Sequence, residues 1–163
     1  MGESTERKSM SYIIIKVKNL TDKIQIPFYG TDDSAGADLY AYIKPDPVFG
    51  DDTKVIRPGE TEVISAGIAV EIPKGYAGMI YARSGLSINN GLAPANKVGV
   101  IDADYRGEIK VALHNHGSEP YVVNDGDRIA QMIIHKVPSV KYVPVDELSD
   151  TERGAGGFGS TGR

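Results

Sequence analysis

The chain has 163 residues, of which 40% are hydrophobic, so it can bury one hydrophobic core and has no surplus for a second of similar size. Its formal net charge of -4 excludes a large basic surface for duplex nucleic acid, and an anionic ligand would need locally placed cations. The absence of cysteine excludes disulfides and thiolate metal sites, and it favours a reducing compartment such as the cytoplasm.

The N-terminal segment 1–11 is polar, and we predict a disordered extension without a functional role. Its first nine residues lack the apolar core of a signal peptide. The apolar runs further along the chain are far shorter than the roughly 20 residues of a membrane helix. We therefore expect no association with a membrane.

Short runs rich in Val, Ile and Tyr then alternate with turn signals, and this pattern predicts one all-β domain over 12–145. Turn residues such as Pro58-Gly59 and Asn124-Asp125-Gly126 separate the runs. The spacing favours a jelly-roll-like barrel or sandwich, with at most one helical turn near 84–89. The predicted strands cover residues 12–17, 38–43, 62–65, 68–72, 78–82, 108–114, 121–123 and 128–137.

The C-terminal segment 146–163 differs from the domain before it. Glycine occupies positions 154, 156, 157, 159 and 162, so the backbone is too flexible to form a packed element. We predict a flexible arm.

Two glycine-centred clusters carry groups suited to cations and phosphates. The first is Ala-Gly-Ala-Asp-Leu at 35–39, in which Asp38 is either a turn-forming residue or a ligand to a hard cation, directly or through water. The second is Arg-Ser-Gly-Leu at 83–86, which follows an apolar run. Its guanidinium, hydroxyl and unencumbered backbone N-H suit a phosphate, although Arg83 could equally be a solvated strand end.

A third cluster spans 99–108, where two apolar arms flank a turn-rich centre and predict a β-hairpin. Main-chain groups at its tip could bind the edge of a nucleobase, and Asp102 could act as a general base. In the alternative interpretation Asp102 and Asp104 form the turn, and Tyr105 packs against the neighbouring strand.

The remaining polar positions are less specific. Arg128 and Gln131 bracket an apolar run in Gly-Asp-Arg-Ile-Ala-Gln at 126–131, which indicates little by itself. The segment 153–162 carries an arginine, an aromatic residue and two hydroxyls, and it could close over a phosphate and a base as a lid. His114 and His116 lie two residues apart, but without a third ligand they predict no metal site.

The order of these clusters resembles that of the trimeric dUTPase family. All five motifs of the family occur in sequence over roughly residues 18–163, and chance assembly of the whole series is hard to credit. The resemblance implies a homotrimer of β-barrel subunits with active sites at the subunit interfaces. It also implies Mg²⁺ as cofactor and dUTP as substrate, with no stable nucleic-acid partner.

The resemblance further implies that water attacks the α-phosphorus in line, producing dUMP and pyrophosphate. This reaction would limit uracil incorporation into DNA and supply dUMP for dTMP synthesis. Carried over by position, Asp102 would orient and deprotonate the attacking water, and Asp38 would belong to the Mg²⁺ environment through a bridging water. The phosphates would be held by Arg83, Ser84, Gly85 and Gln131.

The same resemblance implies how the nucleoside is bound. Uracil would contact Asn96 and the main chain around Val100 and Ile101, with Lys110 as a further contact. Tyr105 would lie under the deoxyribose and reject a 2'-hydroxyl. The arm would close over the substrate with Arg153, Phe158, Gly159, Ser160 and Thr161.

Two departures from the family pattern and two alternative functions remain. Ala37 stands where the family usually has an aromatic residue, and the stretch 44–57 is longer than the usual link.

A dCTP deaminase-like relative would share the fold, but Arg-Ser-Gly at 83–85 differs from its usual Arg-Ser-Ser arrangement. A non-catalytic nucleotide-binding regulator would not require Asp102 and the complete arm.

Overall fold

The computed structural model of the protein describes residues 12–23, 25–45, 47, 50 and 52–157. The predicted extension 1–11 and the last residues of the predicted arm, 158–163, lie outside this part of the chain. Among the described residues the elements are β1 Lys16–Asn19, β2 Ala37–Tyr40, β3 Thr53–Ile56, β4 Thr61–Glu71, β5 Tyr76–Tyr81, α1 Ser84–Asn90, β6 Leu92–Pro94, β7 Gly99–Ile101, β8 Glu108–Asn115, β9 Tyr121–Asn124 and β10 Arg128–Lys136.

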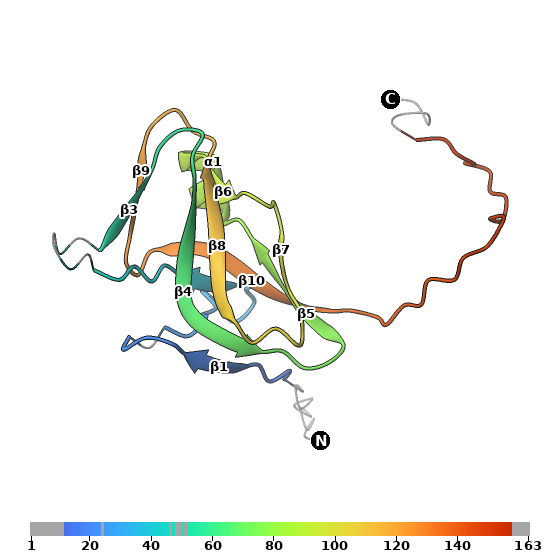
Figure 1. Cartoon of the computed structure of the whole chain (residues 1–163), viewed down its shortest axis with the longest axis horizontal. Helices are drawn as coiled ribbons and strands as arrows, with labels where there is room; N and C mark the ends of the chain where they lie inside the picture. The colour runs from blue at the N-terminus through green and yellow to red at the C-terminus, as the bar shows by residue number, and fades with distance from the viewer. Residues whose placement is uncertain (1–11, 24, 46, 48–49, 51, 158–163) are drawn as a thin grey trace, which may run out of the picture.

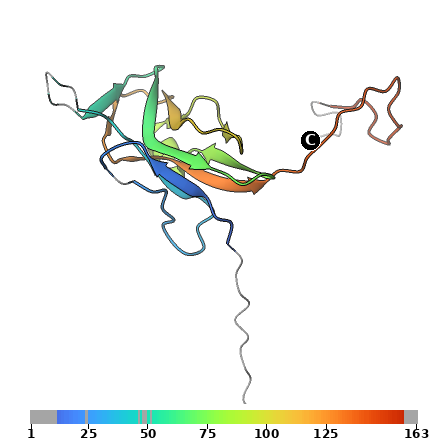
Figure 2. The same ribbon diagram turned by 60° about the horizontal axis from the view of Figure 1, so that its bottom comes forward.

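The strands form three antiparallel sheets (Figure 1). One four-stranded sheet has the order β1-β4-β8-β6 and the other has the order β2-β10-β5-β7, while β3 and β9 form a two-stranded ribbon. Figure 2 shows the strands wrapped around a common interior and the segment after β10 leaving it. The predicted all-β fold is confirmed, and two four-stranded sheets around one core are the arrangement of a jelly roll.

The core follows from alternation along the strands. In β8, Ile109, Val111 and Leu113 are buried, whereas the intervening side chains point outward because successive residues of a strand face opposite sides. Burying an aliphatic side chain of this size contributes about 1.5–3 kcal/mol. Leu39 and Ile129 from the other four-stranded sheet belong to the same buried cluster, so both sheets share one core.

Several elements differ from the prediction. The predicted strands 62–65 and 68–72 are one strand, β4, with a change of register between Ser65 and Ala69 where Gly67 has a φ of 65°. The strands β3 and β6 were not predicted. The first strand begins at Lys16 and not at Tyr12. The predicted helical turn is α1, which ends at Gly91 in the left-handed conformation.

The predicted β-hairpin over 99–108 is wrong. β7 pairs with β5, whereas β8 pairs with β4 and β6, so the two arms belong to different sheets. The connection 102–107 between them still turns, because the N-H of Tyr105 donates to the carbonyl of Asp102 at 3.1 Å.

The chain after β10 leaves the barrel. Residues 137–157 contain no strand or helix, and they run away from the body of the molecule in both ribbon views (Figures 1 and 2). Within the described ranges, none of the helical residues form a segment long and apolar enough to cross a membrane.

Candidate active site

Three of the sequence motifs meet because of strand register in the second sheet. β10 lies between β2 and β5, and Gln131 of β10 is the partner of Asp38 on one side and of Tyr81 on the other. Arg83 follows β5 by two residues. The register therefore brings the 35–39, 83–86 and 126–131 motifs together at one place on the sheet.

Asp38 is the centre of this group. One carboxylate oxygen accepts a hydrogen bond from Nε of Arg83 at 2.8 Å, and the other accepts one from a terminal nitrogen of Arg128 at 3.3 Å. The Asp38 side chain is 13% exposed, and those of Arg83 and Arg128 are 26% and 53% exposed. The remaining guanidinium nitrogens can reach an anion at the surface, so the group can bind phosphate oxygens.

Arg128 is a member that the sequence analysis did not assign to the site. The Arg128 side chain contacts Asp38, and the Arg128 carbonyl accepts a hydrogen bond from Arg83 at 3.2 Å. Its place in the 126–131 motif, directly before an apolar strand, was the available signal. Nothing in the sequence alone links it to Asp38, because the two residues are 90 positions apart.

Gln131 is held close to the same group. Its amide nitrogen donates to the carbonyl of Ala82 at 3.0 Å. A Cβ atom at Gly36 would lie 2.9 Å from its amide oxygen, so the glycine allows the Gln131 side chain to lie against the backbone of the first motif. The side chain is thereby oriented between the first and second motifs.

The other two residues of the second motif begin α1. Ser84 is the first residue of the helix, and Arg83 before it has extended backbone angles. Apart from its chain neighbours and the backbone of α1, none of the described atoms lies within 4 Å of the position that a Cβ of Gly85 would occupy. A ligand can therefore approach the main chain at Gly85 closely.

The third motif forms a separate group around a gap between β7 and β8. In the part of the chain that the structure describes, no strand pairing joins these two strands. The gap is closed at one end by a bond of 2.8 Å from the N-H of Ala95 to the carbonyl of Ala112 and at the other by the 102–107 connection. Val100 and Lys110 lie on the strands that border it, and both are exposed.

The turn before β7 and the residue after it carry further polar groups of this region. The turn preceding β7 contains Lys97, which has a positive φ of 64°. The N-H of Lys97 donates a hydrogen bond to the carbonyl of Pro94. Asn96 lies in this turn, with its amide nitrogen 3.5 Å from a Cβ position at Gly99. Asp102, directly after β7, is exposed to solvent.

Tyr105 lies in the 102–107 connection and contacts the backbone that follows it. Its hydroxyl donates to the carbonyl of Glu108 at 3.0 Å. A Cβ atom at Gly107 would lie 2.4–2.9 Å from the hydroxyl and ring atoms of Tyr105, which only a glycine permits. The ring is therefore packed directly on the backbone, and its position is defined without a ligand.

The two groups of one chain are far apart. β2 and β7 are the opposite edges of the second sheet, so three strand spacings, about 14 Å in all, separate the strand of Asp38 from that of Ile101. Ile101 pairs with Gly78, and Arg83 lies five residues beyond Gly78, or roughly 16 Å along an extended chain. Within one chain the backbone positions of the two groups are therefore separated by roughly 14–16 Å.

Among the residues described, 146–157 of the arm make no hydrogen bond or ion pair with either group in this chain. Arg153 lies in a turn of the arm, where its Nε donates to the carbonyl of Gly156 at 2.9 Å. Phe158, Gly159, Ser160 and Thr161 lie outside the described residues, so their predicted contacts stay predictions.

The two neighbouring histidines form no metal site with the residues described. The ring centres of His114 and His116 lie 4.3 Å apart, and Nδ1 of His114 is 2.8 Å from the Thr61 hydroxyl. Desolvation, followed by the charges of His114 and Lys97, lowers the pKa of His116. No group of three or more His, Cys, Asp or Glu residues that could hold a metal occurs in the described ranges.

Comparison with known proteins gives the family of this chain. The family model described as dUTPase matches residues 22–162. The chain belongs to the dUTPase family. It is 45% identical over 149 residues to the deoxyuridine 5'-triphosphate nucleotidohydrolase of Nautilia profundicola, a match that covers 91% of this chain and 99% of that relative. The corresponding dUTPase of Desulfitobacterium hafniense is 50% identical over 139 residues, covering 85% of this chain and 87% of the relative.

Solved dUTPase structures share the fold. The structure of the Staphylococcus bacteriophage 80alpha dUTPase with dUPNHPP superposes with a TM-score of 0.80 at 28% identity, covering 92% of this chain and 99% of that one. A mutant dUTPase of phage phi11 of S. aureus, described with a structural Mg(II) ion, gives a TM-score of 0.71 at 25% identity and covers 82% and 97% of the two chains.

Proposed function

We propose that this chain hydrolyses dUTP to dUMP and pyrophosphate. The observation that carries the proposal is the gap between β7 and β8, with Asp102 at its edge, in a chain of the dUTPase family. Its relatives are named for this activity, and a structural neighbour is described with the nucleotide analogue dUPNHPP. We propose that this hydrolysis limits uracil incorporation into DNA and supplies dUMP for dTMP synthesis, and that it takes place in the cytoplasm.

The gap would select the base through main-chain groups. β7 uses one edge to pair with β5, and its other edge is not paired with a strand of the described chain, so its main-chain groups could bind a pyrimidine. Cytosine reverses the donor and acceptor at the edge that distinguishes it from uracil, so buried main-chain groups arranged for uracil would be left unpaired. Thymine adds a methyl group, which a close-packed gap rejects by overlap.

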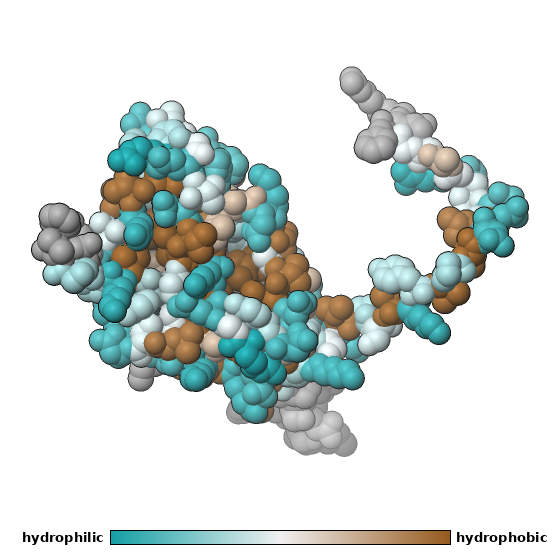
Figure 3. Space-filling model, viewed as in Figure 1, coloured by the Kyte–Doolittle hydropathy of each residue, from teal (hydrophilic) through white to brown (hydrophobic). Residues whose placement is uncertain are grey.

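The catalytic site would be assembled from different copies of the chain in a homotrimer. Three strand spacings separate β2 from β7 within one chain, and this supports a site in which Arg83 of one copy holds the triphosphate and Asp102 of another copy acts on it. Exposed apolar residues over the first sheet favour association, including Val63, which is 61% exposed, and Figure 3 shows apolar surface over this part of the molecule.

Asp102 would act on the attacking water. Its exposed carboxylate can align a water molecule and accept a proton from it. The water oxygen would bond to the α-phosphorus while the bond from that phosphorus to the α,β-bridging oxygen breaks. Pyrophosphate leaves with the electron pair, and the water proton passes to the carboxylate and then to solvent.

The residues around Asp38 fit a magnesium ion shared with the substrate. Mg²⁺ prefers one or two carboxylates together with phosphate oxygens and waters, and the second sheet offers the single carboxylate of Asp38 next to two guanidinium groups. Both Asp38 oxygens already accept hydrogen bonds, which favours contact through a bridging water. When bound, the ion would neutralise charge on the triphosphate.

The arm would cover a site on another copy. It leaves its own barrel after β10 and carries exposed apolar side chains, among them Tyr142 at 92% and Leu148 at 86% exposure. We propose that Arg153, Phe158, Gly159, Ser160 and Thr161 of this arm contact the γ-phosphate and the uracil. Closing the site would exclude bulk water other than the attacking molecule.

Pyrophosphate release tests the proposal directly. The full chain should hydrolyse dUTP in the presence of Mg²⁺ and should act weakly on dTTP, dCTP and UTP. A non-catalytic regulator would bind dUTP without releasing pyrophosphate, and a deaminase would release ammonia from dCTP. Either result would overturn the proposed function.

A further inference from the structure

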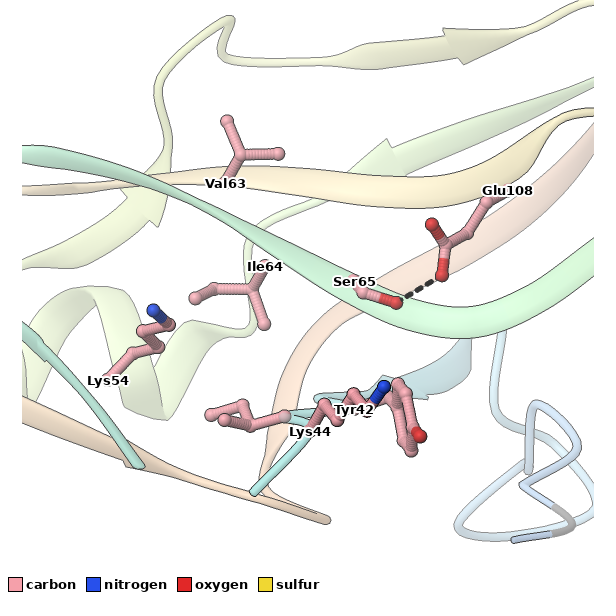
Figure 4. A pocket seen from close by; sticks show the side chains of 8 residues that line it. Tyr42, Lys44, Lys54, Val63, Ile64, Ser65 and Glu108 are labelled. Carbon is pink, nitrogen blue, oxygen red and sulfur yellow. Dashed lines mark hydrogen bonds between the residues drawn. The ribbon is translucent and has the colours of Figure 1, made fainter. Parts of the chain in front are cut away.

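Glu108 begins β8 directly after the 102–107 connection, and it links this connection to β4. Its carboxylate accepts a hydrogen bond from the Ser65 hydroxyl, and Nζ of Lys110 lies 3.4 Å from its other oxygen. Figure 4 shows Glu108 and Ser65 meeting at the wall of a cavity of about 350 Å³. The side chain of Glu108 is 28% exposed, so it is largely shielded from solvent.

Ser65 is a fixed partner because it lies at the bulge of β4. Its hydroxyl oxygen accepts the N-H of Gly67 at 2.9 Å, which leaves the hydroxyl proton for Glu108. The carbonyl of Ser65 accepts the N-H of Tyr42 at 2.8 Å, and that of Gly67 accepts the N-H of Leu20 at 2.9 Å. A Cβ at Gly67 would lie only 2.9 Å from a methyl carbon of Thr21, so the bulge is closely packed.

Glu108 also contacts Tyr105 through its main chain. The Tyr105 hydroxyl donates to the Glu108 carbonyl at 3.0 Å, and the ring packs on Gly107. The position of the ring therefore depends on where the first residue of β8 is held. The Ser65 contact fixes that residue against β4, at a point where β4 and β8 change register.

We propose that Glu108 is a positioning residue for the proposed reaction: its hydrogen bond to Ser65 holds the start of β8, and through it the Tyr105 ring, at the depth that excludes a 2'-hydroxyl. This inference rests on the proposed function and on the placement of Tyr105 under the deoxyribose that the family resemblance implies. A displacement of about 1 Å can cost a large factor in rate, so a remote hydrogen bond can determine sugar specificity.

The test compares dUTP and UTP hydrolysis by the full chain and by four variants. Glu108→Ala and Ser65→Ala should each lower the ratio of kcat/KM for dUTP to that for UTP by on the order of tenfold, and the double variant should lower it no further. Glu108→Gln should keep the ratio within about twofold of the native value, because the amide oxygen still accepts the serine hydroxyl.

Glu60→Ala is the matched control, because Glu60 lies beside the opposite end of β8 and pairs with Arg57. It should leave the ratio unchanged. An unchanged ratio in both Ser65→Ala and Glu108→Ala, with only the melting temperature lowered, would show that the link is purely structural. A fall in Glu108→Gln as large as in Glu108→Ala would instead assign the effect to charge. Each result would overturn the inference while leaving dUTP hydrolysis by the native chain intact, whereas a native chain inactive on dUTP refutes the proposed function itself.

Discussion

Arg83 donates through Nε to the carboxylate of Asp38 at 2.8 Å, although the two residues are 45 positions apart. The contact exists because β10 lies between β2, which carries Asp38, and β5, which Arg83 follows. A second arginine, Arg128, approaches the other oxygen of the same carboxylate. The inner strand β10 thus brings the guanidinium groups of Arg83 and Arg128 and the carboxylate of Asp38 together at the predicted phosphate site.

Replacing Asp38 by Asn should weaken both folding and catalysis. It leaves Arg83 and Arg128 without their anionic partner, and we expect a loss of about 1–2 kcal/mol, less than for a fully buried pair because both guanidinium groups are partly exposed. Urea unfolding measures the loss. The variant should also require a higher Mg²⁺ concentration for half-maximal hydrolysis. Asp32→Asn, on an exposed loop, is the control, and an unchanged Mg²⁺ requirement in Asp38→Asn would remove that residue from the metal environment.

Gly91→Ala should destabilise the protein by about 2 kcal/mol or more. Gly91 ends α1 with a φ of 67°, and a Cβ there would lie 2.6 Å from the backbone nitrogen of Gly117. Gly75 has a similar φ of 87° but no atom within 4 Å of its Cβ position, so Gly75→Ala isolates the cost of backbone conformation. Thermal unfolding should rank Gly91→Ala well below Gly75→Ala. Equal melting temperatures would show that Gly117 moves aside without cost.

His116 should make the stability depend on pH under mildly acidic conditions. Desolvation and the charges of His114 and Lys97 lower its folded-state pKa below the ordinary value of about 6.5, so the unfolded chain binds more protons as the pH falls. The stabilisation is complete above about pH 6.5 and is lost as the pH falls through the lowered folded-state pKa. Melting temperatures measured across this range should fall less steeply for His116→Gln than for the native chain. An identical slope would exclude this contribution.

Deleting residues 153–163 should spare assembly and depress catalysis. The described part of this segment makes no contact that stabilises the barrel, since Arg153 bonds only within its own turn among the residues described. Gel filtration should therefore give the same oligomer as the full chain, while kcat/KM for dUTP falls strongly because the site is no longer covered. An unaffected rate would show that the arm does not act as a lid.

Much of the fold follows from alternation of residue types along the sequence. The runs that became β5, β8 and β10 are long enough to be recognised without their partners. β3 was missed because Thr53–Ile56 buries only Ile56 fully and pairs with β9, a strand about 65 residues away. β6 is three residues long and ends in Pro94, a residue that cannot donate a ladder hydrogen bond. Such strands form through distant pairing, which local sequence does not encode.

The sequence named individual residues of the candidate site but did not predict how they are arranged. Asp38, Arg83 and Gln131 were each named from sequence, and the register brings them together. The two apolar arms on either side of 102–107 indicated a hairpin. In the structure β7 and β8 belong to different sheets, because each pairs with strands outside this segment. The gap that results cannot be predicted from turn chemistry, and neither can the contribution of Arg128.

The most direct test of the composite site mixes two inactive variants. Arg83→Ala lacks a phosphate contact and Asp102→Asn lacks the water-orienting carboxylate, so each homo-oligomer should hydrolyse dUTP very slowly. After the two are unfolded, mixed in equal amounts and refolded together, about a quarter of the sites should combine an intact Arg83 from one chain with an intact Asp102 from another. Pyrophosphate release should then recover to about that fraction of the native rate. If mixed oligomers form and remain inactive, both residues act within one chain and the proposed assembly of the site is wrong.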